Sequence, residues 1–207
     1  MLPCNAMHFV YIWQPYLLKM KKVLLLTLLL TGFVTKAQEE CEYSVITTDT
    51  GEIKSTVDYL MYEKVFAGTS SFIFFSLSNH EGIPILNFQL LAKSNDFPKV
   101  YCLDKNSRIH LQLANGKIAT LISVTEDNCS GLVYDSNENK NLRMLSGMFA
   151  FTKGSLENLE QSPITFMRVK YNGEMVDYPV KSTLQSETMA KTYTPERYFM
   201  DNLKCIK

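Results

Sequence analysis

The chain has 207 residues, of which 46% are hydrophobic, 20% charged and 12% aromatic. These values describe a globular protein long enough for one domain with a buried core, and they exclude a disordered or fibrous chain. The formal net charge is zero, but four of the 21 basic residues precede residue 38 and all 21 acidic residues follow it. The later segment therefore carries a net charge of about −4, which argues against binding to nucleic acid.

The segment 20–37 has the three parts of a secretory signal peptide. The basic pair Lys21-Lys22 precedes twelve uncharged residues, and small residues lead up to Ala37, directly before Gln38. The apolar run is shorter than the roughly 20 residues that cross a bilayer as a helix. We therefore predict cleavage between Ala37 and Gln38, export to the periplasm or the extracellular space, and no membrane span after cleavage.

The first 19 residues belong to neither the signal peptide nor the folded part. They hold Cys4 and the single tryptophan, Trp13, and they precede a second methionine that begins a complete signal peptide. Translation can start at Met1 or at Met20, and the complete signal favours Met20. We expect three segments: a misassigned start at 1–19, the signal peptide at 20–37, and one β-rich domain at 38–207.

Hydrophobic and aromatic stretches bounded by turn residues predict several strands in chain order. Val, Ile, Phe and Tyr in these stretches suit the half-buried surface of a sheet. Outside the two clearest hairpins, the expected strands are 57–66, 71–77, 85–92, 100–103 and 142–151. Of these, 71–77 and 85–92 are expected to form an antiparallel pair joined through 79–82.

The dipeptide Asn115-Gly116 separates two alternating stretches, 108–114 and 117–124. Asn-Gly is typical of a two-residue hairpin loop with a type I′ turn. Such a loop predicts an apolar face built from the pairs Leu113 with Ile118, Leu111 with Thr120, and Ile109 with Ile122. The opposite, polar face would carry Arg108, His110, Gln112 and Ser123.

Asn172-Gly173 predicts a second hairpin from 164–171 and 174–180. Pro179 cannot donate a ladder hydrogen bond, so the return strand is expected at a sheet edge. The expected cross-strand pairs are Met167 with Tyr178, Val169 with Val176, Thr165 with Val180, and, as an ion pair on the other face, Arg168 with Asp177.

Helices are expected at two places. Ser155 would cap a single turn at 155–160. Thr194 and Pro195 suit the start of a C-terminal helix, whose apolar face would hold Phe199, Leu203 and Ile206. The predicted fold is a mostly-β antiparallel sandwich or barrel-like domain of about eight strands with a C-terminal helix.

Four cysteines follow the signal peptide: Cys41, Cys102, Cys129 and Cys205. An even number in an exported chain predicts two disulfides, and four cysteines allow three pairings. The spacing contains no Cys-x-x-Cys, which gives no support to a zinc site or a thioredoxin-type centre.

The run 162–168 (SPITFMR) and the C-terminal Leu203 to Ile206 (LKCI) resemble features of a family of small exported proteins from Bacteroidota-type bacteria. The resemblance covers roughly residues 100–207, with Ser for the usual Thr at 162 and Met for the usual Ile at 167. That family has no known function. It implies that Cys129 pairs with Cys205, and Cys41 with Cys102.

No motif for catalysis, metal or cofactor binding is present. His80 and His110 lack a second histidine at metal-ligand spacing, and neither a nucleophile elbow nor a phosphate loop occurs. The acidic stretches 126–127 and 135–139 lack the ligand positions of an EF-hand, and we interpret them as solvated loops. We predict no catalytic residues, no metal and no cofactor.

The rings of Phe72, Phe74 and Phe75 suit a sandwich core, or else the cavity of a barrel that carries a small apolar ligand. We expect an exported, non-enzymatic binding or interaction module, whose partner is a protein or a small apolar ligand. The alternatives are a hydrophobic-ligand carrier of β-barrel type, with a cavity lined by Phe72 and Phe74, and an unrecognised hydrolase. The hydrolase predicts a cleft where a carboxylate, His80 or His110 meets a nucleophile.

Overall fold

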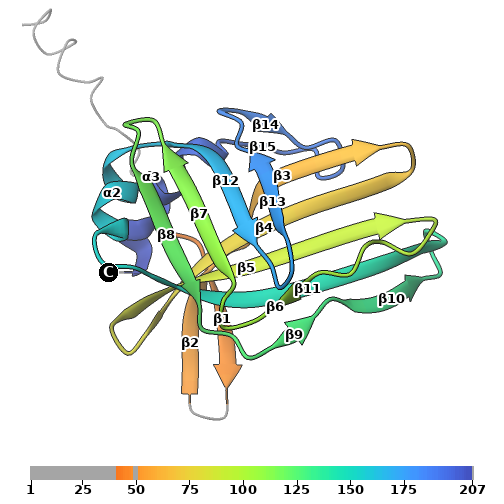
Figure 1. Ribbon diagram of the computed structural model, residues 1–207, viewed down its shortest axis with the longest axis horizontal. Coiled ribbons are helices and arrows are strands. Elements are labelled where there is room, and N and C mark those ends of the chain that lie inside the picture. Colours follow the sequence, from red (N-terminus) through yellow and green to blue (C-terminus); the bar gives the residue numbers. More distant parts are fainter. Residues whose placement is uncertain (1–40, 49–50, 207) are drawn as a thin grey trace, which may run out of the picture. The chain divides into compact units, whose positions relative to one another are not determined.

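Antiparallel strands form most of the protein, which a computed structural model describes at residues 41–48 and 51–206. Strands make up 55% of the structure and helices 12%. These proportions confirm the predicted mostly-β fold with a short C-terminal helix (Figure 1). Residues 1–40 lie outside the described residues, and with them the predicted start segment, the signal peptide and its cleavage site at Ala37 and Gln38.

In the described part of the chain, one large sheet is accompanied by two short ladders. The large sheet contains β1 (Tyr43–Thr48), β2 (Gly51–Thr56), β3 (Tyr59–Phe66), β4 (Thr69–His80), β5 (Ile83–Ser94), β7 (Arg108–Leu113), β8 (Ile118–Ser123), β10 (Gly131–Asp135), β11 (Lys140–Phe151), β12 (Ile164–Lys170) and β13 (Met175–Pro179). The ladders pair β6 (Cys102–Leu103) with β9 (Asn128–Cys129), and β14 (Leu184–Gln185) with β15 (Thr192–Tyr193). The helical segments are α2 (Ser155–Gln161), η2 (Pro195–Arg197), α3 (Tyr198–Asn202) and η3 (Leu203–Ile206).

The long strands β4, β5 and β11 connect the two parts of the sheet. Along one edge of β4 lie β3 and then β2, while β11 carries β10 and then β8 on the edge away from β5. From β8 the order continues through β7 and β12 to β13. These four strands cross over β4, β5 and β11 (Figure 1). The sheet does not close, so the fold is a sandwich and not a closed barrel.

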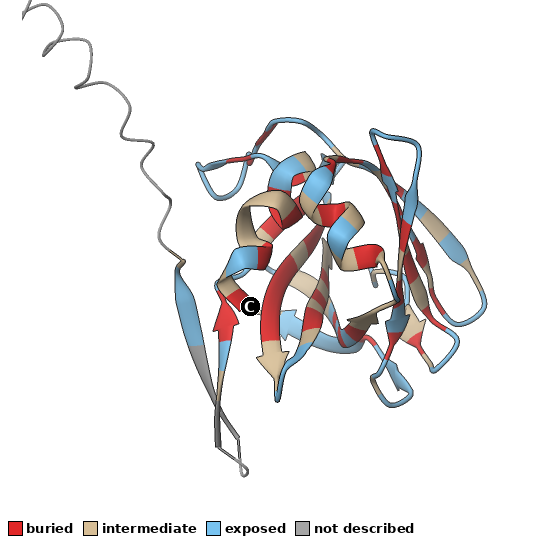
Figure 2. Cartoon of the chain, turned by 90° about the vertical axis from the view of Figure 1, so that its left-hand side faces the viewer, coloured by how far each residue is buried: buried red, intermediate tan, exposed pale blue. Residues whose placement is uncertain are grey.

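The main hydrophobic core lies between these two parts of the sheet. β4 and β5 contribute Phe75 and Phe88, β7 and β12 contribute Leu111 and Met167, and all four side chains are buried. The C-terminal segment closes this core, and the three residues predicted to share its apolar face are buried there (Figure 2): Phe199, Leu203 and Ile206.

The five predicted strands outside the hairpins are present with shifted ends. β4 and β5 extend further toward each other than expected, so that only Glu81 and Gly82 separate His80 from Ile83. β3 begins at Tyr59, β11 begins at Lys140, and β6 keeps only two residues of the range 100–103. The strands β1, β2, β9, β10, β14 and β15 were not predicted.

The predicted register of the first hairpin is wrong by one residue. Gln112 lies opposite Ile118, where a two-residue loop would place Leu113. The loop instead has three residues, closed by a hydrogen bond of 2.9 Å from the Leu113 amide to the Lys117 carbonyl. Within this loop only Gly116 has a positive φ, of 81°. A type I′ turn requires positive φ at both central residues, so the predicted turn type is also wrong.

This shift reverses the two faces of β8. Ala119 and Leu121 are fully buried, whereas Ile118 and Ile122 are 63% and 36% exposed. A one-residue slip exchanges the faces because side chains alternate along a strand.

The second hairpin has the predicted register. Phe166 pairs with Pro179 at the last rung, so the expected pair of Thr165 and Val180 lies beyond the ladder. Gly173 has a φ of 88°, and Asn172 is not among the described residues with positive φ, which rules out a type I′ turn here as well. As Pro179 predicted, β13 is an edge strand. The confirmed pairs are Met167 with Tyr178, Val169 with Val176, and Arg168 with Asp177.

Helix α2 begins differently from the prediction. Gly154 is the N-cap, with a φ of 81°, and Ser155 is the first helical residue. The Ser155 hydroxyl donates to the Thr120 carbonyl at 3.2 Å and therefore ties the helix to β8 instead of capping it. Thr194 does precede the first turn of η2, as predicted, but its side chain makes no capping hydrogen bond.

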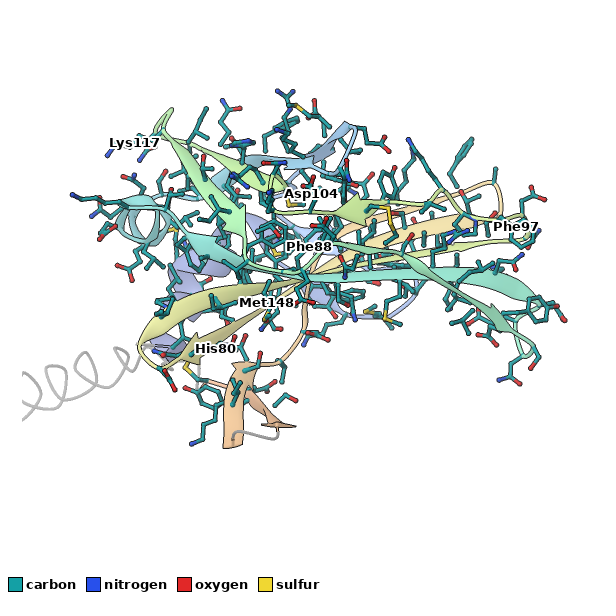
Figure 3. All side chains as sticks on the ribbon, turned by 60° about the horizontal axis from the view of Figure 1, so that its bottom comes forward. His80, Phe88, Phe97, Asp104, Lys117 and Met148 are labelled. Atoms are coloured by element: carbon teal, nitrogen blue, oxygen red, sulfur yellow. A yellow bond between two sulfur atoms is a disulfide. The ribbon has the colours of Figure 1, made fainter. Side chains whose placement is uncertain are left out.

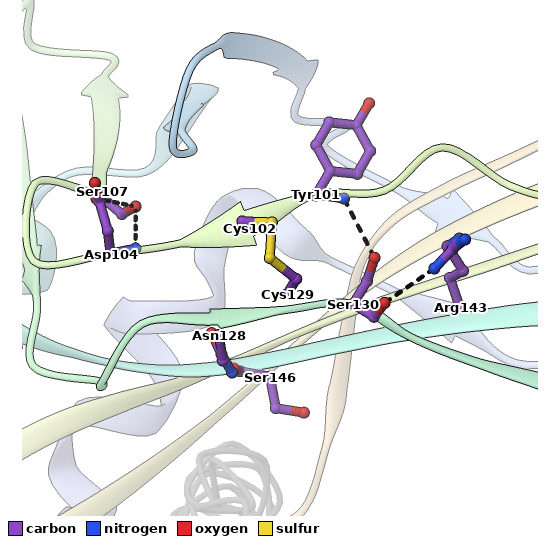
Figure 4. The surroundings of a disulfide bond; sticks show 9 residues. All are labelled: Tyr101, Cys102, Asp104, Ser107, Asn128, Cys129, Ser130, Arg143 and Ser146. Atoms are coloured by element: carbon purple, nitrogen blue, oxygen red, sulfur yellow. Dashed lines mark hydrogen bonds between the residues drawn. A yellow bond between two sulfur atoms is a disulfide. The ribbon is translucent and has the colours of Figure 1, made fainter.

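All four candidate cysteines form disulfides, but not in the pairs that the family resemblance implies. Cys41 bonds to Cys205, and Cys102 bonds to Cys129 (Figure 4). Cys102 and Cys129 face each other in the β6–β9 ladder, so their pairing follows from strand register. Two disulfides are typical of proteins that fold in an oxidising compartment.

None of the helices in the described ranges is long and apolar enough to cross a membrane.

Candidate functional site

The strongest candidate site lies on the outer face of β7, β8, β12 and β13. Pairing of β12 with β7 places the polar faces of the two hairpins side by side. One row across the strands contains Asp177, Arg168, His110 and Thr120. Side chains alternate along each strand, and the neighbouring residues Leu111 and Met167 face the core, so this row points away from it.

A pocket of about 320 Å³ is hollowed into this face. Two exposed apolar side chains form part of its wall, Ile118 and Met175, at 63% and 61% exposure. We call it the basic pocket, and it is lined by His110, Gln112, Ile118, Phe166, Arg168 and Met175.

Arg168 makes two contacts on this face. Its Nε and Nη2 donate to the two carboxylate oxygens of Asp177, at 2.5 and 2.8 Å. This hydrogen-bonded pair lowers the pKa of Asp177. The guanidinium carbon also lies 6.0 Å from the centre of the Phe166 ring, within the range of a cation–π contact. Arg168 is therefore held at the pocket by a carboxylate and a ring.

Two further cations flank the pocket, because the next row contains Lys170 and Arg108. Arg108 donates to the backbone carbonyls of Lys105 and Ser107, at 2.8 and 2.7 Å. Neither Arg108 nor Lys170 takes part in an ion pair with a described residue. This face thus presents three permanent positive charges against the single carboxylate of Asp177.

His110 lies within this positive field. Its Nδ1 is 3.1 Å from the Thr120 hydroxyl oxygen. Partial burial lowers the pKa of His110, and the charges of Arg168, Arg108 and Lys170 lower it further. The imidazole is therefore neutral near neutral pH and gains a proton only when the pH falls or a negative charge enters the pocket.

The hydrolase alternative would require a reactive side chain beside a histidine. His80 does lie near a serine, with Nε2 3.0 Å from the Ser78 hydroxyl oxygen. Ser78 is only 1% exposed, however, and its oxygen accepts a hydrogen bond of 3.2 Å from the Asn87 amide. The same amide donates to Ser55 at 3.3 Å. This network links β2, β4 and β5 and does not present Ser78 to a substrate.

The three phenylalanines of β4 pack in two different places. Phe75 belongs to the main core, whereas Phe72 packs against Leu60, Leu184 and Tyr193 in a second cluster. Phe74 is half-buried beside that second cluster. Neither Phe72 nor Phe74 lines the basic pocket.

Other candidate residues have local roles. The Asp135 carboxylate accepts hydrogen bonds from the backbone amides of Asn137 and Glu138, as in a solvated turn. In the part of the chain that the structure describes, no group of three or more His, Cys, Asp or Glu side chains could hold a metal ion.

Sequence reasoning identified most of these polar residues but not the site. It placed His110 and Gln112 on one polar face and paired Arg168 with Asp177. The pairing of β12 with β7 joins the two faces, and it depends on tertiary packing that no local pattern records. Comparisons of the chain with protein-family models, with curated proteins and with solved structures find no match.

Proposed function

We propose that this protein is an exported, non-enzymatic binding module and that the basic pocket binds a small anion with an apolar body. The observation that carries the proposal is the charge balance of the face around the pocket: Arg108, Arg168 and Lys170 against Asp177. An anionic group would accept hydrogen bonds from Arg168. An apolar body would cover Ile118 and Met175, which water now contacts.

Export belongs to the same proposal. The basic, apolar and small-residue parts of 20–37 support cleavage after Ala37, and the two disulfides support an oxidising destination in the periplasm or outside the cell. The resemblance to a family of small exported proteins points the same way.

The test uses the disulfide-bonded protein and two naphthalene probes. Naphthalene-2-sulfonate carries a permanent negative charge, and 2-naphthylmethanol has the same rings without it. We expect the sulfonate to bind at least about tenfold more tightly in isothermal titration calorimetry, because a hydrogen bond to a charged group contributes about 1.5–3 kcal/mol. Arg168→Gln should remove most of this difference and leave the binding of the uncharged probe unchanged.

Two further variants test whether the effect depends on charge at this face. Lys64→Gln removes an exposed cation on β3, far from the pocket in the sheet order, and should leave affinity unchanged. Asp177→Asn removes the competing carboxylate and should raise affinity for the sulfonate. Equal losses in Arg168→Gln and Lys64→Gln would contradict the site. Substrate turnover that survives purification of the protein to homogeneity would contradict a purely binding role.

A further inference from the structure

A second groove crosses the outer face of the other part of the sheet, over β4, β5 and β11. It consists of two adjoining hollows of about 390 and 290 Å³, which share Asp58 and Ser76. Figure 3 labels Met148 and His80, which belong to the strands β11 and β4 under this groove. We call it the hydroxyl–amide groove, and it is lined by Ser44, Ser55, Thr56, Val57, Asp58, Ser76, Asn87, Phe88, Gln89, Thr125, Ser146, Gly147 and Met148.

Strand register explains why polar groups gather there. Ser76, Asn87 and Met148 lie opposite one another across β4, β5 and β11. The next row on the same face contains Phe74, Gln89 and Ser146. These two rows thus present the amides of Asn87 and Gln89 and the hydroxyl of Ser146 on the outer face, with the half-buried ring of Phe74 at their margin.

Several of these polar groups are available to a ligand. The side-chain nitrogen of Asn87 is occupied by Ser55 and Ser78, but its oxygen has no partner among the described residues. Gln89 makes only a long contact, 3.4 Å from its nitrogen to the sulfur of Met144. Within the described ranges, the Ser146 hydroxyl has no side-chain hydrogen bond and Asp58 takes part in no ion pair.

The charge of the lining narrows the ligand class. Among the described residues that line it there is no Lys, Arg or His, and their one charge is the carboxylate of Asp58. An anion would be repelled by Asp58. A purely apolar ligand would bury the amides of Asn87 and Gln89 without hydrogen bonds, which is costly. A ligand that both donates and accepts many hydrogen bonds satisfies this lining.

We propose that the hydroxyl–amide groove binds a neutral saccharide chain. Sugar hydroxyls donate to the Asp58 carboxylate and to the oxygens of Asn87 and Gln89, and they accept from the Ser146 hydroxyl. The apolar faces of the sugar rings lie against Met148, which is 39% exposed, and against the edge of Phe74. This site is separate from the basic pocket in residues and in strands, so it does not depend on the function proposed for that pocket.

The test titrates the disulfide-bonded protein with neutral hexasaccharides of glucose, mannose and xylose, and measures binding by calorimetry. A hexagalacturonate and a hexalysine peptide serve as anionic and cationic comparators. At least one neutral hexasaccharide should bind with a Kd below about 1 mM, and the hexagalacturonate should bind more weakly. Gln89→Ala and Asp58→Ala should each weaken saccharide binding about fivefold or more, because each removes hydrogen bonds to the ligand.

Controls test whether a loss of saccharide binding reflects unfolding of a variant, and whether the saccharide binds at the basic pocket instead. Asp58 is exposed, and the Gln89 side chain makes one long hydrogen bond, so both variants should keep the melting temperature of the parent. Arg168→Gln should leave saccharide binding unchanged, and Asp58→Ala should leave naphthalene-2-sulfonate binding unchanged. Absence of binding by all three neutral hexasaccharides, or saccharide affinity in both variants equal to that of the parent protein, would overturn the proposal. Preferential binding of hexalysine that Asp58→Ala abolishes would also overturn it and assign the groove to cationic peptides.

Discussion

His110 shows how neighbouring charges set the state of a single side chain. It is partly buried, it lies between Arg168 and Thr120 on the outer face, and Arg108 and Lys170 occupy the adjacent row. Burial and these three positive charges lower its pKa, burial being the largest single cause. The folded protein therefore binds fewer protons at this position than the unfolded chain, and acidification through the unperturbed pKa of about 6.5 disfavours the folded state.

A bound anion should reverse this effect. A sulfonate in the basic pocket offsets the positive charges and raises the pKa of His110, so binding takes up a proton. We expect affinity for naphthalene-2-sulfonate to rise about three- to tenfold between pH 7.5 and about pH 5.5. The probe and Asp177 both stay ionised over this range, since the hydrogen-bonded Arg168 lowers the pKa of Asp177.

The matching measurement is a titration series across pH for the parent protein and for His110→Gln. The variant should bind the sulfonate with nearly constant affinity. A pH dependence that persists in His110→Gln would show that another group carries the proton.

For single residues, the sequence predicted those contacts that depend only on residues nearby in the chain. The ion pair of Arg168 and Asp177 follows from hairpin register and was predicted correctly. Ser155 was misassigned as a cap because Gly154 adopts the left-handed conformation that begins the helix, and the Ser155 hydroxyl then bonds to Thr120 on a distant strand. Local preference for serine at an N-cap does not record that tertiary partner.

At the scale of elements, the β7–β8 hairpin shows how loop length decides which residues form the site. The three-residue loop needs positive φ only at Gly116. It turns Leu121 into the core and leaves Ile118 on the outer face, where Ile118 forms a wall of the basic pocket. With the two-residue loop predicted from Asn-Gly, Ile118 would be in the core and the pocket would lack this wall.

Strand β11 depends on a glycine for close packing. A Cβ added at Gly147 would lie 2.4 Å from the Leu103 Cδ1 atom, inside van der Waals contact. Leu103 is 1% exposed and the site around it is packed, so Gly147→Ala should lower the free energy of unfolding by about 1–3 kcal/mol.

Gly131 in β10 provides the matched control, because a Cβ there meets nothing within 4 Å and its φ is not positive. Gly131→Ala should leave stability within about 0.5 kcal/mol of the parent in urea denaturation. Equal stability of the two variants would contradict the close approach of β6 to β11.

Element prediction succeeded where hydrophobic patterns are long. The pairs β4–β5 and β12–β13 have apolar faces that specify their register. The unpredicted strands are short, or they depend on distant partners. Strand β10, for example, pairs with β11 although Leu132, Val133 and Tyr134 remain exposed. Its sequence therefore lacks the alternation of buried apolar and exposed polar residues that predicts a strand.

At the scale of the whole molecule, the disulfide between Cys41 and Cys205 joins the two ends of the described domain. Nearby, the Tyr43 hydroxyl donates to the Cys205 carbonyl at 2.9 Å, and the Asn79 amide donates to the Ile206 carbonyl at 2.7 Å. These contacts fix η3 against β1 and β4. The bridge between Cys102 and Cys129 closes a much shorter loop, of 27 residues against 164.

Loop length predicts how much each disulfide stabilises the protein. In the chain-entropy model, the longer loop contributes about 5 kcal/mol and the shorter about 3.5 kcal/mol. Cys41→Ser with Cys205→Ser should therefore lower the free energy of unfolding by about 1.5 kcal/mol more than Cys102→Ser with Cys129→Ser. Urea unfolding of both double variants measures this difference, and a greater loss in the short-loop variant would contradict it.

The composition and strand pattern sufficed to predict a mostly-β fold with a C-terminal helix. They did not predict the disulfide pairing, because Cys41 meets Cys205 only after the chain ends converge in the folded domain. Nor did they predict the two candidate sites, which form where β12 pairs with β7 and where β4, β5 and β11 align. Both depend on the order of strands in the sheet, which no local sequence pattern encodes.

The most direct test of an exported, disulfide-closed binding module is the native mass of the protein recovered from its own host. We predict the mass of residues 38–207 less four hydrogens, with peptide mapping that links Cys41 to Cys205 and Cys102 to Cys129. A non-covalent adduct that is bound to the parent protein and absent from Arg168→Gln would identify the ligand of the basic pocket. A mass that retains residues 20–37, or that shows free thiols at these four cysteines, would contradict the account.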